Sequence, residues 1–115
     1  MSEKRVISAL KGLGLSLSDA QVYIFLAKNG ATRIQRIEKD LNIEKGVLDE
    51  SLKDLSNLGI IHFSIKDPSM FTAIPFEDVI DVFIEVKKEQ AKTMQESRED
   101  LLSTWKTILK KNSAK

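Results

Sequence analysis

From Phe76 onward the chain contains neither Gly nor Pro, which favours one long helix. Acidic side chains lie near its start and basic ones near its end, and both suit the helix dipole. Up to Lys111 such a helix is about 50 Å long, at about 1.5 Å per residue. Ser97 is followed three residues later by Asp100, so a new helix could begin there. The chain therefore divides into a small domain, 1–75, and a long C-terminal helical element, 76–115.

Within the small domain, apolar residues first recur at helical spacing over residues 3–13. Ser16 and Asp19 then form a capping-box pattern for a second helix, which ends at Gly30. Thr32 and Gln35 repeat that spacing before a short third helix. A turn leads into a fourth helix over residues 44–58, closed by a C-cap glycine. Two short helices joined by a tight turn indicate a helix-turn-helix.

The stretch "IIHFSIKDPSMFTAI" that follows has the pattern of a β-hairpin. Ile61, Phe63 and Ile65 alternate with polar residues. Phe71 and Ala73 follow a turn at residues 66–69. The fold class predicted is therefore mainly α with a small β-hairpin wing: a winged helix-turn-helix plus a long C-terminal dimerisation helix.

Composition restricts the function classes. Lys and Arg total 18 against 17 Asp and Glu in 115 residues, so the net charge is only +1, unlike that of most nucleic-acid binders. Residues 1–43 hold seven basic and four acidic side chains, whereas residues 44–58 hold two and four. The basic charge therefore precedes the fourth helix, and the acidic charge falls on it.

Catalysis and metal binding find no support in the residue patterns. The chain has no Cys and one His, His62, which we expect to be an exposed strand residue. No nucleophile–base pair, phosphate-binding loop or metal-ligand spacing is found, so we expect neither an enzyme nor a cofactor. Without a membrane-spanning apolar run or a signal peptide, the expected location is cytoplasmic and nucleoid-associated.

Three segments resemble the TrmB-like transcriptional regulators, which are mostly archaeal. They are "LGLSLSDAQVYIFLAKNG" (13–30), "LKDLSNLGII" (52–61) and "PSMFTAIP" (68–75), and the resemblance covers roughly residues 5–85. It implies a winged-helix fold and a dimer that binds promoter DNA. Many members also carry a C-terminal sugar-sensing domain. That domain is expected to be absent here, and no small-molecule effector is evident.

The candidate DNA-binding residues lie on the third helix, the fourth helix and the wing: Arg33, Arg36, Lys45, Gly46, Val47, Asp49, Lys53 and Lys66. Four of them, Arg33, Arg36, Lys45 and Lys66, are expected to contact phosphates and so to position a helix in the major groove. Gly46, Val47 and Asp49 stand where the family often carries residues that read bases. An outward face that includes Asp49 and Glu50 repels phosphates and is equally typical of a solvated helix face.

The long helix carries two apolar blocks separated by a polar stretch that contains Met94. An isolated block would face water, so we expect a second copy to cover it. An antiparallel pair centred on Met94 brings the two blocks together. The dimerisation residues predicted are Val79, Phe83, Val86, Met94, Leu101, Leu102, Trp105, Ile108 and Leu109. A helix that breaks near Ser97 and folds back on its own domain is the alternative.

The function predicted from the sequence is that of a dimeric regulator that binds double-stranded DNA through a winged helix-turn-helix. One alternative is a winged helix used for protein–protein assembly without specific DNA binding. Another is architectural DNA binding of low specificity.

Overall fold

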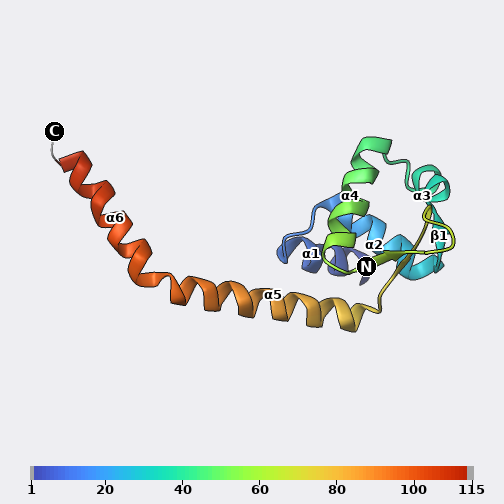
Figure 1. The fold of residues 1–115 in the computed structure, drawn as a ribbon. Helices are drawn as coiled ribbons and strands as arrows, with labels where there is room; N and C mark the ends of the chain where they lie inside the picture. The colour runs from blue at the N-terminus through green and yellow to red at the C-terminus, as the bar shows by residue number, and fades with distance from the viewer. Residues whose placement is uncertain (1, 114–115) are drawn as a thin grey trace. The chain divides into compact units, whose positions relative to one another are not determined.

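The computed structural model describes residues 2–113 and divides the chain into two units, Met1–Val82 and Phe83–Lys115. Over residues 2–113, six helices and three strands follow in order (Figure 1). They are α1 (Ser2–Gly12), α2 (Leu17–Asn29), β1 (Thr32–Arg33), α3 (Ile34–Leu41), α4 (Lys45–Asn57), β2 (Ile61–Phe63), β3 (Met70–Ala73), α5 (Phe76–Glu96) and α6 (Arg98–Ser113). The first unit contains the helix-turn-helix and the wing.

Helix α2 lies at the centre of the first unit, because it contacts α1, α3, α4 and β3. The predicted capping box at its start is confirmed. The Ser16 hydroxyl accepts from Asp19 N–H at 3.0 Å, and the Asp19 carboxylate accepts from Ser16 N–H at 3.2 Å. At its middle, the buried Tyr23 donates its hydroxyl hydrogen to the Ile74 carbonyl at 2.8 Å. This bond ties α2 to the chain that leaves the sheet.

Helix α4 begins and ends close to its predicted limits. Its buried leucines, Leu48, Leu52 and Leu55, each stabilise the fold by roughly 1.5–3 kcal/mol. At its end, Gly59 has φ of 76° and donates to Ser56, while Ile60 N–H donates to the Leu55 carbonyl. These two bonds define a Schellman motif, which needs a residue of positive φ at the glycine position.

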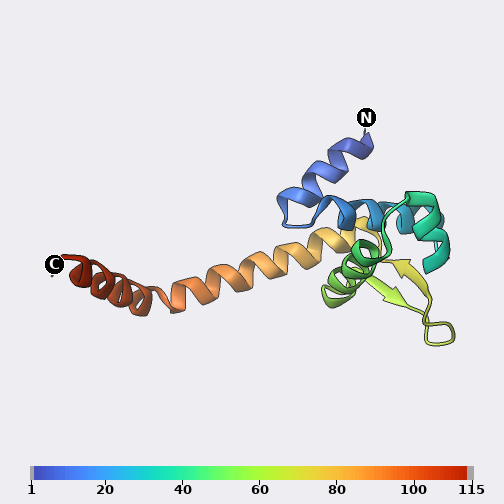
Figure 2. The ribbon, with the colours of Figure 1, turned by 90° about the horizontal axis from the view of Figure 1, so that it is seen from above.

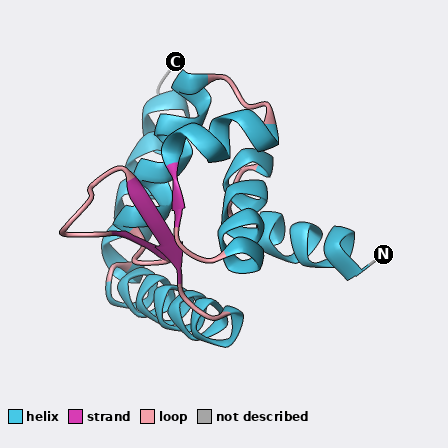
Figure 3. Cartoon of the chain, turned by 90° about the vertical axis from the view of Figure 1, so that its right-hand side faces the viewer, coloured by secondary structure: helices cyan, strands magenta, loops and turns pink. Residues whose placement is uncertain are grey.

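The three strands form one antiparallel sheet in the order β1-β3-β2, in the part of the chain that the structure describes. Figure 3 shows β2 and β3 as two arrows joined by a long loop, the wing. Ile61 pairs with Ala73 and Phe63 with Phe71, which confirms the predicted hairpin. The wing loop is held by Asp67, whose carboxylate accepts from the Ser69 N–H at 3.1 Å and from its hydroxyl at 2.6 Å.

Strand β1 corrects the prediction that Thr32 caps the third helix. Thr32 and Arg33 pair instead with Phe71 and Met70 of β3, and the Thr32 hydroxyl donates to the Gly30 carbonyl at 2.8 Å. Arg33 takes the N-cap position of α3 without a capping side-chain bond. The capping-box spacing was misleading here, because pairing with a distant strand holds Thr32 in an extended conformation.

The C-terminal helical element is two helices rather than one. α5 ends at Glu96 and α6 begins at Arg98, with Ser97 between them. Ser97 N–H still donates to the Thr93 carbonyl at 3.0 Å, and Leu101 N–H donates to the Ser97 carbonyl at 2.9 Å. The interruption therefore spans about one residue, at the position where the Ser97–Asp100 pattern allowed a new helix.

Candidate nucleic-acid interface

The helix-turn-helix is formed by α3 and α4. Asn42 ends α3 in the left-handed conformation, with φ of 52° and ψ of 45°. Asparagine tolerates this conformation because its short polar side chain can bond to nearby backbone groups. Only Asn42, Ile43 and Glu44 separate the two helices, and the Leu48 N–H already donates to the Glu44 carbonyl at 2.9 Å. The turn is therefore short and well defined.

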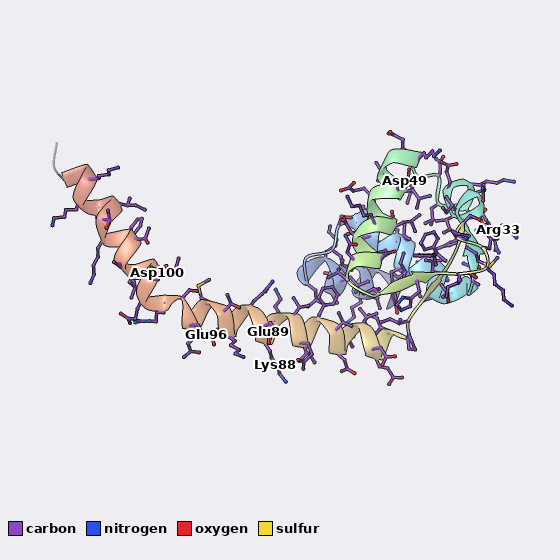
Figure 4. All side chains as sticks on the ribbon, viewed as in Figure 1. Arg33, Asp49, Lys88, Glu89, Glu96 and Asp100 are labelled. Atoms are coloured by element: carbon purple, nitrogen blue, oxygen red, sulfur yellow. The ribbon has the colours of Figure 1, made fainter. Side chains whose placement is uncertain are left out.

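The outward face of α4 holds the residues predicted for it. Leu48, Ser51 and Leu52 are buried, and the exposed side chains include every candidate DNA-binding residue of this helix: Lys45, Gly46, Val47, Asp49 and Lys53. Figure 4 shows Asp49 on this helix. Two lysines are the exposed cations of a face that also carries Asp49 and Glu50, so α4 offers few donors for bidentate contacts with bases.

One flank of α4 joins the start of α2 around a hollow of about 500 Å³. Its lining includes four carboxylate residues: Asp19, Glu44, Glu50 and Asp54. Of these four carboxylates, the sequence had placed only Glu50 on the outward face of α4. A helical projection could have placed Val47, Glu50 and Asp54 on one flank, because they lie three and four residues apart. Asp19 could not be added, because it reaches this flank only through tertiary packing.

Arg33, at the N-cap position of α3, and Arg36, within α3, are both exposed, and both have partners. Arg33 Nη1 lies 2.6 Å from Asp67 Oδ2 of the wing, and Figure 4 shows Arg33 at the start of α3. Arg36 pairs with Asp40 at 3.3 Å, and its guanidinium carbon lies 5.9 Å from the centre of the Phe25 ring. Exposed ion pairs contribute little stability, so a phosphate can displace either carboxylate.

The wing tip is a site of mixed charge. Lys66 is exposed as predicted, and Asp67 follows it. The hydroxyl and N–H of Ser69 lower the pKa of the Asp67 carboxyl, and the charge of Arg33 lowers it further. Asp67 is therefore ionised at neutral pH. The structure thus brings Arg33 and Lys66 to the same end of the domain, together with an aspartate that sequence reasoning had not assigned to the site (Figure 2 shows the wing loop).

A family model described as the sugar-specific transcriptional regulator TrmB matches residues 10–77. The chain belongs to the TrmB family. The match spans α2, the helix-turn-helix, the wing and the start of α5, so the predicted family is confirmed. Because the family consists of transcriptional regulators, the chain is not an enzyme.

One curated relative is the uncharacterized protein MJ1503 of Methanocaldococcus jannaschii. It is 28% identical over 94 residues, and the match covers 76% of this chain and 71% of the relative. Its name assigns no activity. The comparison therefore supports a fold shared over most of both chains and leaves the family match to indicate function.

Two solved structures share the fold. TrmBL2, described as an archaeal chromatin protein with a novel mode of DNA binding, superposes with a TM-score of 0.78 at 18% identity over 90% of this chain. This chain spans 40% of the TrmBL2 chain. A MarR-family transcriptional regulator from Silicibacter pomeroyi gives a TM-score of 0.53 at 16% identity, over 93% of this chain and 79% of its own. The winged-helix fold is thereby confirmed.

The predicted dimerisation residues fall into two groups. Val79 is fully buried in the first unit and Phe83 is 4% exposed, so neither side chain is available to a second copy. This corrects the two predictions, which rested on a periodicity that marks an apolar face without showing what covers it. Val86 is half-buried, whereas the remaining side chains are exposed: Met94, Leu101, Leu102, Trp105, Ile108 and Leu109.

Over residues 2–113, no group of three or more His, Asp or Glu side chains is arranged to hold a metal ion. His62 is exposed on β2, as expected. None of the described helices combines the length and the apolar character that crossing a membrane requires.

Proposed function

We propose that this protein is a transcriptional regulator that binds double-stranded DNA as a homodimer, in the cytoplasm and at the nucleoid. The observation that carries the proposal is the cluster at the wing end of the domain. There, Arg33 of the helix-turn-helix and Lys66 of the wing lie beside Asp67, within a winged helix of a family of transcriptional regulators. Both cations are exposed where this fold class approaches DNA.

Phosphate contacts supply most of the binding free energy in this mechanism. Arg33, Arg36 and Lys66 bind backbone phosphates and thereby position α4 in the major groove. Lys45 and Lys53 then lie close to the strand backbones at the groove edges. These contacts carry charge but little sequence information, so we expect modest specificity.

Gly46 lets the backbone of α4 approach the groove closely. A Cβ atom built on Gly46 would meet only the Glu44 Oε1 atom, at 3.6 Å, which is an ordinary contact. Packing within the domain therefore does not require a glycine here. Its value lies at the exposed surface, where a missing side chain leaves room for a sugar–phosphate backbone. Gly46→Leu is expected to leave the fold intact and to weaken DNA binding.

The carboxylates of α4 limit the affinity. Glu44, Asp49, Glu50 and Asp54 repel phosphates, while Lys45 and Lys53 attract them. The protein should therefore bind DNA with few net charge contacts. In a titration with mixed genomic duplex at several salt concentrations, we expect log K to fall against log [salt] with a slope on the order of −2 to −5 per dimer.

A second candidate function is assembly with a basic protein segment. The observation that favours it is the hollow lined by Asp19, Glu44, Glu50 and Asp54, which suits lysine or arginine side chains better than phosphates. The same titration separates the two functions. Failure to bind any duplex at low salt would contradict DNA binding and favour this candidate, whereas binding without preference between genomic and random duplex indicates an architectural role.

A further inference from the structure

Helix α6 has a nearly symmetric sequence about Trp105. Leu102 and Ile108 lie three residues to either side of it, and Leu101 and Leu109 lie four. Ser103 and Thr107, both small and polar, lie two residues away. At five and six residues from Trp105, the sign of the charge is opposite on the two sides. Asp100 and Glu99 precede Trp105, and Lys110 and Lys111 follow it.

These five apolar side chains form one continuous stripe. At about 100° per residue they cover roughly 120° of the helix circumference, with Trp105 in the middle. All five are exposed in the described chain, by between 38% and 54%. A continuous apolar stripe of this kind is typical of a surface that binds another protein.

We infer that two copies of α6 pack antiparallel, with the two-fold axis of the homodimer passing beside Trp105. This inference rests on the proposed dimer and specifies the surface that forms it. In this register Leu101 of one copy lies at the level of Leu109 of the other, and Leu102 lies at the level of Ile108. An antiparallel two-fold pair requires that the two halves of a helix be complementary, and the symmetry of α6 about Trp105 meets that requirement.

The charges select the orientation. In the antiparallel pair, Glu99 and Asp100 lie at the level of Lys110 and Lys111 of the second copy. In the helical projection these charged residues point away from the apolar interface between the two helices. They therefore attract one another along the solvent-exposed sides of the pair and do not form buried ion pairs. A parallel pair would bring acidic turn beside acidic turn and align the two helix dipoles, and both effects are unfavourable.

The register centred on Met94, which the sequence pattern suggested, is less compatible with the structure. It places Val79 opposite Leu109, but Val79 is fully buried in the first unit. It also places Glu89 opposite Glu99, two like charges, although Lys88 then lies opposite Asp100. Figure 4 labels Lys88, Glu89 and Asp100 on α5 and α6. In contrast, the register centred on Trp105 uses only residues of α6.

Cysteine cross-linking tests the register, because the natural chain contains no cysteine. Leu101→Cys and Leu109→Cys proteins are prepared separately, each with Trp105 intact, and are mildly oxidised alone and as an equimolar mixture. We expect a disulfide-linked dimer that joins one protein of each kind in the mixture. Each protein alone should remain uncross-linked, because the two Leu101 positions of the pair are about 12 Å apart along the axis at about 1.5 Å per residue.

Ser103→Cys with Thr107→Cys is the matched control. The two positions share a level in the pair but lie on the far side of the helix, so their mixture should not cross-link. Cross-linking of Leu101→Cys alone would show a parallel pair, and cross-linking of Met94→Cys alone would show the register centred on Met94. Either result overturns the inference.

Sedimentation of the unmodified chain separates this inference from the proposed dimer. A chain that sediments as a dimer but shows no Leu101–Leu109 cross-link forms its dimer through another surface, which overturns the inference alone. A chain that sediments as a monomer at every concentration overturns the dimer as well. DNA binding is measured independently of both.

Discussion

Arg33 Nη1 lies 2.6 Å from Asp67 Oδ2, and this ion pair joins the start of α3 to the tip of the wing. The other carboxylate oxygen, Oδ1, accepts from the N–H and the hydroxyl of Ser69. Asp67 therefore stabilises the turn of the wing through hydrogen bonds, and it also forms an ion pair with an arginine that is proposed to bind phosphate. In the proposed complex, DNA competes with Asp67 for Arg33, and we therefore expect Asp67 to lower the affinity for DNA.

Replacing Asp67 by Asn should strengthen DNA binding several-fold. Asparagine retains an oxygen that accepts from Ser69 but releases Arg33, so the salt slope should steepen by about one per winged helix. Fluorescence anisotropy with a labelled duplex at several salt concentrations measures both quantities. Asp81→Asn, which removes the same charge from α5, is the control. An unchanged affinity for Asp67→Asn would show that Arg33 does not contact phosphate.

Removing the Tyr23 hydroxyl should destabilise the first unit. Tyr23→Phe leaves the Ile74 carbonyl without its 2.8 Å bond, at a cost of about 1–3 kcal/mol. Burial raises the pKa of Tyr23, and the negative charge of Asp78 raises it further. The folded pKa therefore exceeds the unfolded one. The resulting stability is complete below pH of about 10 and is lost as the pH rises through the folded pKa.

Tyr23 is the only tyrosine, so tyrosinate absorbance follows its ionisation directly. We expect titration above the ordinary tyrosine range, and a shift back toward that range in Asp78→Asn. Urea unfolding of wild type and Tyr23→Phe at neutral and alkaline pH measures the stability difference. A difference that grows with alkaline pH would contradict the assigned direction of the pKa shift.

The acidic face of α4 gives a third prediction. Replacing Asp49 and Glu50 together by Gln removes two repulsive charges and adds amide donors. DNA affinity should increase by on the order of tenfold if each repulsion costs roughly 0.5–1 kcal/mol. Glu77→Gln with Asp81→Asn removes two charges from α5 as a matched control. If the α4 variant binds DNA as the wild type does, while Arg33→Ala abolishes binding, then α4 does not face DNA.

Deleting the chain from Glu96 onward should leave a folded monomer. Among the described residues, the buried apolar side chains all precede Ile84, so the deletion removes no core residue. Circular dichroism should show an intact thermal transition, and sedimentation should show the mass of a single truncated chain. DNA affinity should fall as well, because two linked winged helices bind more tightly than one.

The full-length chain offers a finer measurement, because Trp105 is the only tryptophan and is 54% exposed in the single chain. Emission should be blue-shifted in the dimer and move to the red on dilution. Trp105→Ala should weaken the dimer by a few kcal/mol, because each copy loses a large aromatic contact. Emission independent of concentration, at all concentrations that can be measured, would count against burial of Trp105 between two copies.

Features coded by neighbouring residues were predictable from the sequence. The Ser16–Asp19 capping box, the glycine C-cap of α4 and the wing hairpin each depend on a short pattern, and each is confirmed. Strand β1 was missed because two residues carry no periodicity and their partner lies in β3, far along the chain. Thr32 had the right neighbours for a cap but the wrong tertiary context.

In the candidate site, too, features coded by neighbouring residues were predictable and features that depend on tertiary packing were not. Helical spacing was sufficient to place Lys45, Asp49 and Lys53 on the exposed face of α4. The Arg33–Asp67 pair, and the hollow that Asp19 and Glu50 both line, depend on packing between separate segments, for which one sequence has no local signal. Val79 illustrates the remaining difficulty. An apolar stripe in a sequence shows that some surface covers the helix. The pattern is the same whether that surface belongs to the helix's own domain or to a second copy of the chain.

Strand β1 has a consequence for how the interface can change. Thr32 and Arg33 pair with Phe71 and Met70, and the Ile34 N–H donates to the Ser69 carbonyl at 2.9 Å. The separation between the start of α3 and the wing is therefore set by main-chain bonds, which do not depend on side-chain identity. Side chains of the wing loop, such as the exposed Ile65 and Lys66, can be exchanged without altering that separation. A more basic loop grafted between β2 and β3 should therefore change which ligand the domain binds. The separation between the start of α3 and the wing should stay the same.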